Sequence, residues 1–262
     1  MALYNYTAMP PRFLRTSDLA KAAGIHVNTV RLYEQWGLIP PVERSPSGYR
    51  RFTRTHLDCL LLARLVYSGV YPGTAIRRSG TAVILKAVSG DLGGALELAY
   101  RHQAVIAAER AQAEASAALL ERWAEGTAAE TAGRSLRVGD AARLLGVSID
   151  ILRNWERNGL MTVPRDPSNG YRLYGPDEIG RARVIRMLGY SGYSIMSILR
   201  MLTDLDAGRT GDLRASLDTP RPDEDVFMAS DRWISTLADQ EKLSGKVIAH
   251  LEEMIRRQGE DE

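Results

Sequence analysis

The sequence contains the same pattern twice, and this repeat limits the possible folds more than any other feature. Residues 16–52 and residues 138–174 align without a gap, and every matched pair is 122 positions apart. The matched residues are Asp18 with Asp140, Ala20 with Ala142, Gly24 with Gly146, Arg31 with Arg153, Glu34 with Glu156, Gly37 and Leu38 with Gly159 and Leu160, and Gly48, Tyr49 and Arg50 with Gly170, Tyr171 and Arg172. A constant offset over so long a window indicates a tandem duplication.

The offset divides the chain of 262 residues into two units of roughly 125 residues, a usual size for a domain. Apolar residues make up 45% of the chain and charged residues 25%, as in ordinary globular proteins. We expect an N-terminal arm over 1–14, a first domain over 15–80, a linking region with a long helix over 81–126, a linker over 127–134, a second domain over 135–203, an acidic loop over 204–227 and a second long helix over 228–262.

Basic charge is concentrated in the two repeated regions. Residues 12–78 hold eleven Lys or Arg against four Asp or Glu, and residues 134–202 hold eleven against six. The rest of the chain has a net charge of −10, although the whole chain has a net charge of only +2. Positive charge confined to two matched modules indicates a polyanion as their partner.

The cysteine and histidine content argues against a metal centre. Cys59 is the single cysteine, so the chain can form no internal disulfide and no site with two thiolate ligands. We expect it to be a small buried residue on a helix. The four histidines, which show no metal-like spacing, are His26, His56, His102 and His250. We therefore expect neither a metal nor another cofactor.

No feature of the sequence indicates an enzyme, a secreted protein or a membrane protein. Paired carboxylates, a nucleophile elbow and a phosphate-binding loop are not recognisable. The first residues, MALYNYTAMPPR, lack the basic region and apolar core of a signal peptide. No apolar run approaches the roughly 18 residues that a membrane span needs. We expect a cytoplasmic location.

The first half of each repeat has the pattern of a helix-turn-helix. Thr16 is expected to cap a helix that ends at Gly24. A short turn then leads to a second helix over about 27–36. In the second copy, Ser148 is a better helix N-cap than its counterpart His26. Two short helices joined by such a turn form a helix-turn-helix.

Turn chemistry follows each helix-turn-helix. The segments 45–48 and 166–170 combine Pro, Ser or Asn, and Gly between short extended stretches, so each predicts a small hairpin, or wing. A third helix is expected over about 54–68 and 176–190. A fourth, short helix is then expected, which is apolar at Ile76 in the first copy and at Ile195, Ile198 and Leu199 in the second.

Each unit ends in a long helical segment. Residues 94–125 are rich in alanine and contain no proline, so their helix propensity is high. In the segment 228–257, residues three and four apart form one stripe: Ile234, Leu237, Glu241, Ser244, Ile248, Leu251 and Ile255. Such a stripe predicts lengthwise packing against another helix. The expected fold is mainly α, with two tandem winged helix-turn-helix domains that are each followed by a long, coiled-coil-type helix.

The geometry of duplex DNA matches this arrangement. The start of the second helix can enter the major groove, where side chains reach the base edges. The residues of the wing can contact phosphates, which positions the module without reading sequence. The candidate contacts are His26, Asn28, Thr29, Arg31, Tyr49, Arg50 and Arg51 in the first copy, and Ser148, Asp150, Ile151, Arg153, Tyr171 and Arg172 in the second. The alternative is that the tyrosines are core residues and the arginines are merely solvated.

The segment LAKAAGIHVNTVRLYEQWGLIPPVERSPSGYRRF resembles the DNA-binding domain of MerR-type transcription regulators, whose pattern combines LRYYE, GLI and a wing with GYRxY. The tail DVFMASDRWISTLADQEKLSGKVIAHLEEM is similar to the region of that family's dimerisation helix. The resemblance adds Tyr33 and Trp155 to the DNA contacts or their supports. Leu32 and Asn154 stand where the family usually has a tyrosine, which leaves a backbone contact there unsupported.

The resemblance also implies a function and partners. The family acts on a two-fold symmetric promoter site as a homodimer joined by long helices, and it controls transcription by RNA polymerase by distorting the promoter. This chain already holds two modules and two long helices, so we expect an intramolecular pseudo-dimer rather than a homodimer. Because His26 and Asn28 differ from Ser148 and Asp150, the double-stranded DNA site should be an imperfect palindrome. Such a protein would be associated with the nucleoid.

Two alternatives remain open at this stage. The protein could be a sensor or sequestering protein for a small molecule, such as an antibiotic, as some members of the resembled family are. Its ligand pocket would then be sought at Tyr100, Trp123 and Trp233, although structural packing explains these aromatic residues as well. The protein could also be an architectural DNA-binding factor with a similar winged helix.

Overall fold

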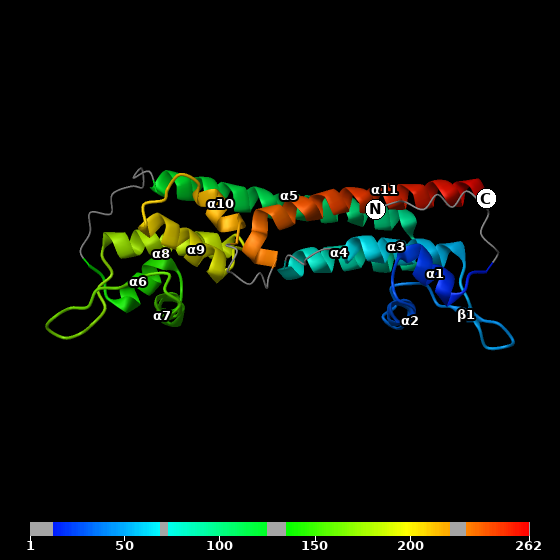
Figure 1. The fold of residues 1–262 in the computed structure, drawn as a ribbon, viewed down its shortest axis with the longest axis horizontal. Helices are drawn as coiled ribbons and strands as arrows, with labels where there is room; N and C mark the ends of the chain where they lie inside the picture. The colour runs from blue at the N-terminus through cyan, green and yellow to red at the C-terminus, as the bar shows by residue number, and fades with distance from the viewer. Residues whose placement is uncertain (1–12, 69–72, 125–134, 221–228, 262) are drawn as a thin grey trace. The chain divides into compact units, whose positions relative to one another are not determined.

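The computed structural model describes residues 13–68, 73–124, 135–220 and 229–261 (Figure 1). These residues divide between two compact units. The first unit comprises residues up to Ala107 together with Asp239–Glu262, and the second comprises Ala108–Ala238. The predicted linker over 127–134 and the predicted loop segment 221–227 lie outside the described residues.

The first unit contains the first winged helix-turn-helix and segments of both long helices. Its elements are α1 (Thr16–Ala23), α2 (Val27–Gln35), β1 (Glu43–Arg44), β2 (Arg50–Arg51), α3 (Arg54–Val66), α4 (Gly73–Val88), the first half of α5 (Leu92–Arg122) and most of α11 (Trp233–Asp261). Strands β1 and β2 pair antiparallel and form the predicted wing, with Glu43 opposite Arg51. The helices of the helix-turn-helix lie within one residue of their predicted bounds.

The second unit repeats this order. Its elements are α6 (Val138–Leu145), α7 (Ile149–Arg157), α8 (Pro176–Tyr190), α9 (Ile195–Asp206), α10 (Leu213–Asp218), a short 3-10 helix (Ala229–Arg232), the second half of α5 and the start of α11. The wing of this unit is held by the isolated bridge between Arg165 and Arg172. The fold is therefore mainly α with two helix-turn-helix domains, as predicted.

The last residue of the predicted N-terminal arm belongs to the first domain, while residues 1–12 of that arm lie outside the described residues. Leu14, placed in a loose arm, is buried and pairs with Phe52, as Leu136 pairs with Tyr174 in the second unit. The N-cap of α1 is Arg15 rather than Thr16, and the backbone N–H of Arg15 donates to the Asp18 carboxylate at 2.8 Å. Leu14 and Leu136, which come just before the two helix-turn-helix motifs, are therefore parts of their domains.

Two further expectations fail outside the repeated pattern. The fourth helix of the first copy, α4, has 16 residues and is not short. The predicted acidic loop contains the helix α10, because Leu213 and Leu217 are buried one turn apart and the helix packs on α9.

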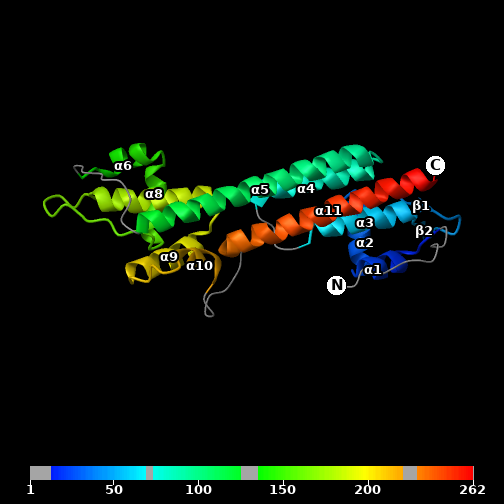
Figure 2. The same cartoon turned by 90° about the horizontal axis from the view of Figure 1, so that it is seen from above.

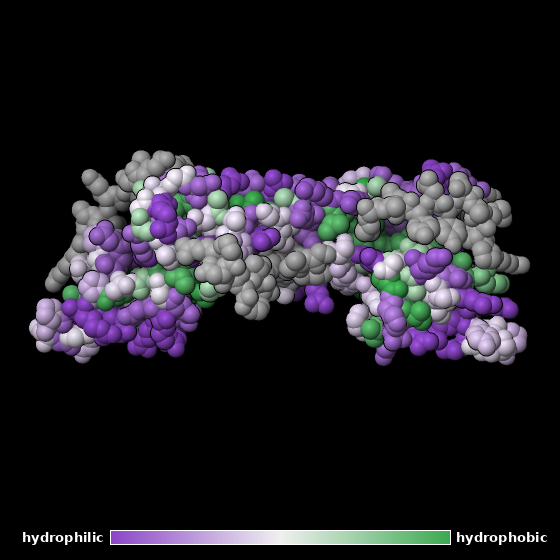
Figure 3. Space-filling view, viewed as in Figure 1, coloured by the Kyte–Doolittle hydropathy of each residue, from purple (hydrophilic) through white to green (hydrophobic). Residues whose placement is uncertain are grey.

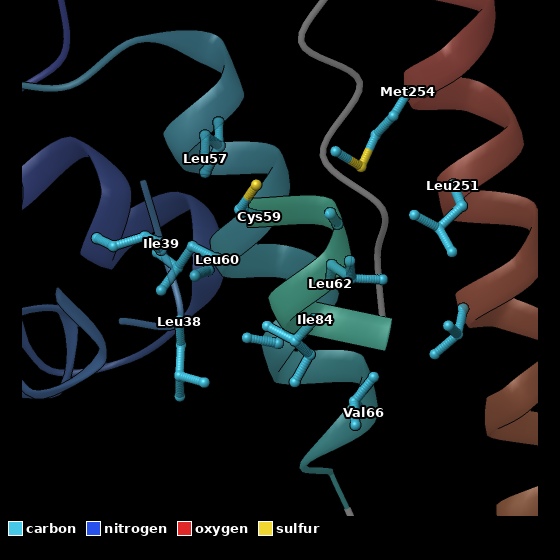
Figure 4. Packing of buried hydrophobic residues seen from close by; sticks show 14 of the residues in the cluster. Leu38, Ile39, Leu57, Cys59, Leu60, Leu62, Val66, Ile84, Leu251 and Met254 are labelled. Atoms are coloured by element: carbon cyan, nitrogen blue, oxygen red, sulfur yellow. The ribbon is translucent and has the colours of Figure 1, made fainter. Parts of the chain in front are cut away.

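The core of the first unit is organised around α3 (Figure 4). Cys59 and Leu60 are fully buried, and Leu60 lies beside Ile39 from the chain after α2. On the other side, Leu251 and Met254 of α11 point toward α3. Burial raises the pKa of the Cys59 thiol to about 12, so Cys59 is the small buried helix residue that we expected.

Polar contacts reinforce the packing of α11 on α3, which run side by side in Figure 2. The Asp58 carboxylate accepts a hydrogen bond from the Arg257 guanidinium at 3.1 Å, and only 8% of the Asp58 side chain is exposed. The His250 ring Nε2 lies 2.9 Å from the backbone oxygen of Asp58. Burial lowers the pKa of His250, which favours its neutral form. In the second unit the position that matches Asp58 is Gly180. A Cβ at Gly180 would lie 3.5 Å from the indole nitrogen of Trp123, next to the end of α5.

Each winged helix-turn-helix is thus covered by a long helix from the other repeat. In the first unit, Ile248 of α11 joins the same buried cluster as Ala95 and Ala99 of α5. In the second unit, the Tyr193 hydroxyl donates to the backbone oxygen of Ala113 on α5 at 3.1 Å. Each unit therefore contains chain segments from both repeats.

Replacing Tyr174 by Phe should leave the free energy of unfolding unchanged or raise it by up to about 1 kcal/mol. Tyr174 is fully buried and its hydroxyl has no hydrogen-bond partner among the described residues, whereas the first repeat has Phe52 at the matching position. Urea denaturation followed by circular dichroism measures the change. The reverse replacement, Phe52→Tyr, is the control and should cost about 1–3 kcal/mol. A clear loss of stability in Tyr174→Phe would mean that the hydroxyl is hydrogen-bonded.

Candidate nucleic-acid interface

The first helix-turn-helix exposes the start of α2. Gly24 ends α1 in the left-handed conformation at φ 60°, which a residue without a Cβ adopts easily. His26 then caps α2, and its Nδ1 accepts from the backbone N–H of Asn28 at 3.2 Å. His26, Asn28 and Arg31 are exposed, and Arg31 Nη1 donates to Asn28 Oδ1 at 3.4 Å. Thr29 is half-buried.

The second helix-turn-helix has the same geometry with different side chains. Gly146 ends α6 at φ 62°, and the Ser148 hydroxyl caps α7 by accepting from the backbone N–H of Ile151 at 3.2 Å. Ser148, Asp150, Ile151 and Arg153 are exposed. An Arg153 nitrogen lies 3.5 Å from an Asp150 carboxylate oxygen, which matches the contact between Arg31 and Asn28. In Figure 3 hydrophilic side chains cover the surface around α7.

A matched ion pair connects each wing to the second helix of its helix-turn-helix, α2 or α7, which we call the recognition helix. Arg50 Nε lies 2.8 Å from Glu34 Oε2, and Arg172 Nε lies 2.6 Å from Glu156 Oε2. The hydrogen bond to Glu156 raises the pKa of Arg172 above its ordinary value. Each bond uses Nε, and no described residue is bonded to the terminal nitrogens of either guanidinium, so these nitrogens can donate to another acceptor. The pairs therefore hold both arginines in one orientation.

Sequence reasoning overlooked the two glutamates as site residues. The signal was present, because Glu34 and Glu156 match in the repeat and each precedes its wing arginine by 16 positions. A spacing of 16 across a turn and two extended segments does not by itself indicate a contact. The three-dimensional pairing was needed to find it.

The wing tips carry the exposed tyrosines. Tyr49 is 76% exposed and Tyr171 is 60% exposed, so the alternative that they are core residues is wrong. In both wings an arginine closes the tip, since Arg44 donates to the backbone oxygen of Gly48 at 3.1 Å and Arg165 to that of Gly170 at 3.2 Å.

The remaining candidate contacts are partly engaged within the domains. The Arg51 guanidinium lies 4.8 Å from the centre of the Phe13 ring. Tyr33 and Trp155 occupy matching positions and are half-buried. Tyr33 stacks on Trp36 with a ring separation of 6.2 Å, and burial raises the pKa of Tyr33. These residues are better placed to support the recognition helix than to read bases.

The aromatic residues considered for a ligand pocket have separate surroundings. Tyr100, in the first unit, is exposed and its hydroxyl donates to Glu252 at 3.2 Å. In the second unit Trp233 is buried, packs on Gly192 and donates its indole N–H to the backbone oxygen of Ser191 at 2.5 Å. Trp123 is half-buried. A small-molecule site at these residues stays a prediction.

The part of the chain that the structure describes holds no cluster of three metal-ligating side chains. In the same ranges no helix is both long enough and apolar enough to cross a membrane. His102 is buried on α5, where Nδ1 lies 2.8 Å from the Ser79 hydroxyl, and burial lowers its pKa. His250 of α11 contacts α3 in the same way, so both histidines lie at contacts between helices.

Comparison with known families agrees with the duplicated geometry. Residues 15–52 match the model of the MerR family regulatory protein, and residues 136–205 match that of the MerR HTH family regulatory protein. Each match covers one helix-turn-helix and its wing, and the second continues through α8 and most of α9.

Curated relatives are transcription regulators by name and not enzymes. The HTH-type transcriptional regulator CueR of Vibrio cholerae is 47% identical over 49 residues, which are 19% of this chain and 35% of that protein. The HTH-type transcriptional regulator ZntR homolog of Haemophilus influenzae is 45% identical over 47 residues, or 18% and 35% of the two chains.

The HTH-type transcriptional repressor CarH of Myxococcus xanthus is 27% identical over 115 residues, or 43% of this chain and 38% of that protein. The alignments thus span little more than a third of the relatives' own length. No solved structure matches. The two family matches, at the two places where the sequence repeats, identify the chain as a member of the MerR family with two tandem MerR-like domains.

Proposed function

We propose that this protein is a DNA-binding transcription regulator whose two domains bind the two halves of one imperfectly palindromic promoter site. The observation that carries the proposal is the matched interface: both domains expose a capped recognition-helix start, an arginine one turn later, and a wing arginine held by a glutamate. These features suit duplex DNA, since a recognition helix reads bases and a wing contacts phosphates.

We further propose that a single chain provides both DNA-binding domains of the complex, which we call its two heads. The support is the composition of the two units, because each combines one winged helix-turn-helix with long-helix segments from both repeats. A homodimeric member of such a family would obtain the second helix from a partner chain. Here the second helix already comes from the same chain, so duplication has replaced dimerisation.

The remaining parts of the proposal follow from the family. The protein distorts promoter DNA and so regulates RNA polymerase. Bending a DNA site costs roughly 1–6 kcal/mol, which the additional contacts in the bent complex offset. Because it binds promoters, the protein is located in the cytoplasm and associated with the nucleoid.

The first test is the mass of the complex. Light scattering on the protein alone, and on a duplex chosen from a random pool, should give one chain per molecule and one chain per duplex. A duplex holding a single half-site is the control and should bind more weakly. Two chains per pseudo-palindromic duplex would contradict the single-chain arrangement, while failure to select any duplex would contradict DNA-binding regulation itself.

The second test concerns the wing arginines. Replacing Arg50 or Arg172 by Ala should weaken binding to every duplex and lower the slope of log affinity against log salt by about one, because one phosphate contact is lost. Replacing the partner, as in Glu34→Gln, keeps the guanidinium charge and should weaken binding with the slope preserved. An unchanged slope in Arg50→Ala and Arg172→Ala would exclude these residues from phosphate contact.

A further inference from the structure

We propose that one residue position makes the two halves of the site different: Asn28 selects adenine in one half, and Asp150 selects cytosine in the other. Arg31 and Arg153, which match in the repeat, then read a guanine common to both halves. This inference rests on the proposed function, because it concerns which bases the two heads recognise. It identifies the residues that break the palindrome.

The placement of the two side chains is equivalent. Asn28 is the second residue of α2, and Asp150 is the second residue of α7. Both are exposed, with 87% of the Asp150 side chain accessible. The first residues of a recognition helix are those that reach base edges in the major groove. Neither side chain is needed to cap its helix, because His26 and Ser148 do so.

The chemistry of the two side chains differs. An Asn side chain has a carbonyl oxygen and an amino group, so it can accept from adenine N6 and donate to adenine N7. An ionised Asp side chain only accepts hydrogen bonds. At the major-groove edge, cytosine offers the N4 amino group as a donor, whereas guanine offers only acceptors. Adenine offers an amino group there too, but places the acceptor N7 beside it. A carboxylate at this position therefore favours cytosine.

The neighbouring arginines explain how a carboxylate is tolerated near the phosphates. Arg153 lies 3.5 Å from Asp150, and Arg31 lies 3.4 Å from Asn28, so each arginine is already beside the discriminating side chain. In the second head the guanidinium compensates the negative charge of Asp150. Each guanidinium also has enough donors to bind guanine O6 and N7. The two DNA-binding domains thus have the same guanine-binding arginine. They differ in the side chain beside it, which is Asn28 in one domain and Asp150 in the other.

A purely structural role for Asp150 predicts a different effect of its replacement. An acidic residue in the first turn of a helix stabilises the helix through its dipole, whatever DNA is bound. In that case Asp150→Asn would lower stability and change affinity for all duplexes alike. Base preference at one position of one half-site separates the two explanations.

The experiment uses the full-length protein and a duplex selected from a random pool. Each base pair of the two half-sites is replaced in turn, and dissociation constants are measured by fluorescence anisotropy. Replacing the cytosine in one half, or the adenine in the other, should weaken wild-type binding by roughly 5- to 150-fold. The variants Asn28→Asp and Asp150→Asn are then tested on the same set.

Asp150→Asn should shift the preference of its half from cytosine to adenine, and Asn28→Asp should do the reverse in the other half. The double exchange should bind best to the site with the two preferences interchanged. Asp239→Asn, on an exposed position of α11, removes the same charge and should change no base preference. Circular dichroism checks that all variants are folded.

The outcomes separate this inference from the proposed function. Failure of the wild-type protein to select any sequence would overturn the proposed function. Selection of a defined site whose base preferences are unaltered by both exchanges would overturn the inference alone. A shift confined to one half and one position, in the direction stated, supports it.

Discussion

The burial of each domain's third helix under a long helix from the other repeat is the interaction on which the rest of the structure depends. In the first unit, Leu251 and Met254 of α11 cover α3, whose other face holds the helix-turn-helix through Leu60 and Ile39. The recognition helix is therefore positioned by a core to which both repeats contribute. Burying apolar side chains of this size stabilises a fold by about 1.5–3 kcal/mol each, so neither repeat has a complete core alone.

The ion pairs between wing and recognition helix extend this rigidity to the surface. Glu34 holds Arg50, and Glu156 holds Arg172, in the same way in both domains. A half-buried pair of this kind limits the rotamers of a long arginine side chain, and so reduces the entropy lost when it binds a phosphate. Its value lies in orientation more than in stability, since partly exposed ion pairs contribute little free energy.

The repeated pattern could be predicted well from the sequence, because local signals agree there. Gly24 and Gly146 adopt the left-handed conformation that ends a helix, and Ser148 caps α7 as expected. The errors lie where tertiary packing decides. Leu14 pairs with Phe52 across a gap of 38 residues, and α10 forms because its two leucines meet α9, which no local periodicity reveals. The glutamates of the wing pairs were missed for the same reason. The DNA contacts themselves stay predictions.

A chain with two similar domains and two similar long helices must also avoid the wrong combination, in which the C-terminal end of each long helix packs on the third helix of its own repeat. The contacts between the long helix and the third helix differ between the two units, so each long helix fits one of the two third helices better than the other. Arg257 of α11 finds the Asp58 carboxylate on α3, but would meet only Gly180 at the matching place on α8. Trp123 fits against that glycine, whereas at the matching place on α3 it would meet the nearly buried Asp58 carboxylate in place of Arg257. A misassembled pairing would thus take one arginine partner from a nearly buried carboxylate and take Trp123 from its glycine, which favours the observed arrangement of the duplicated chain.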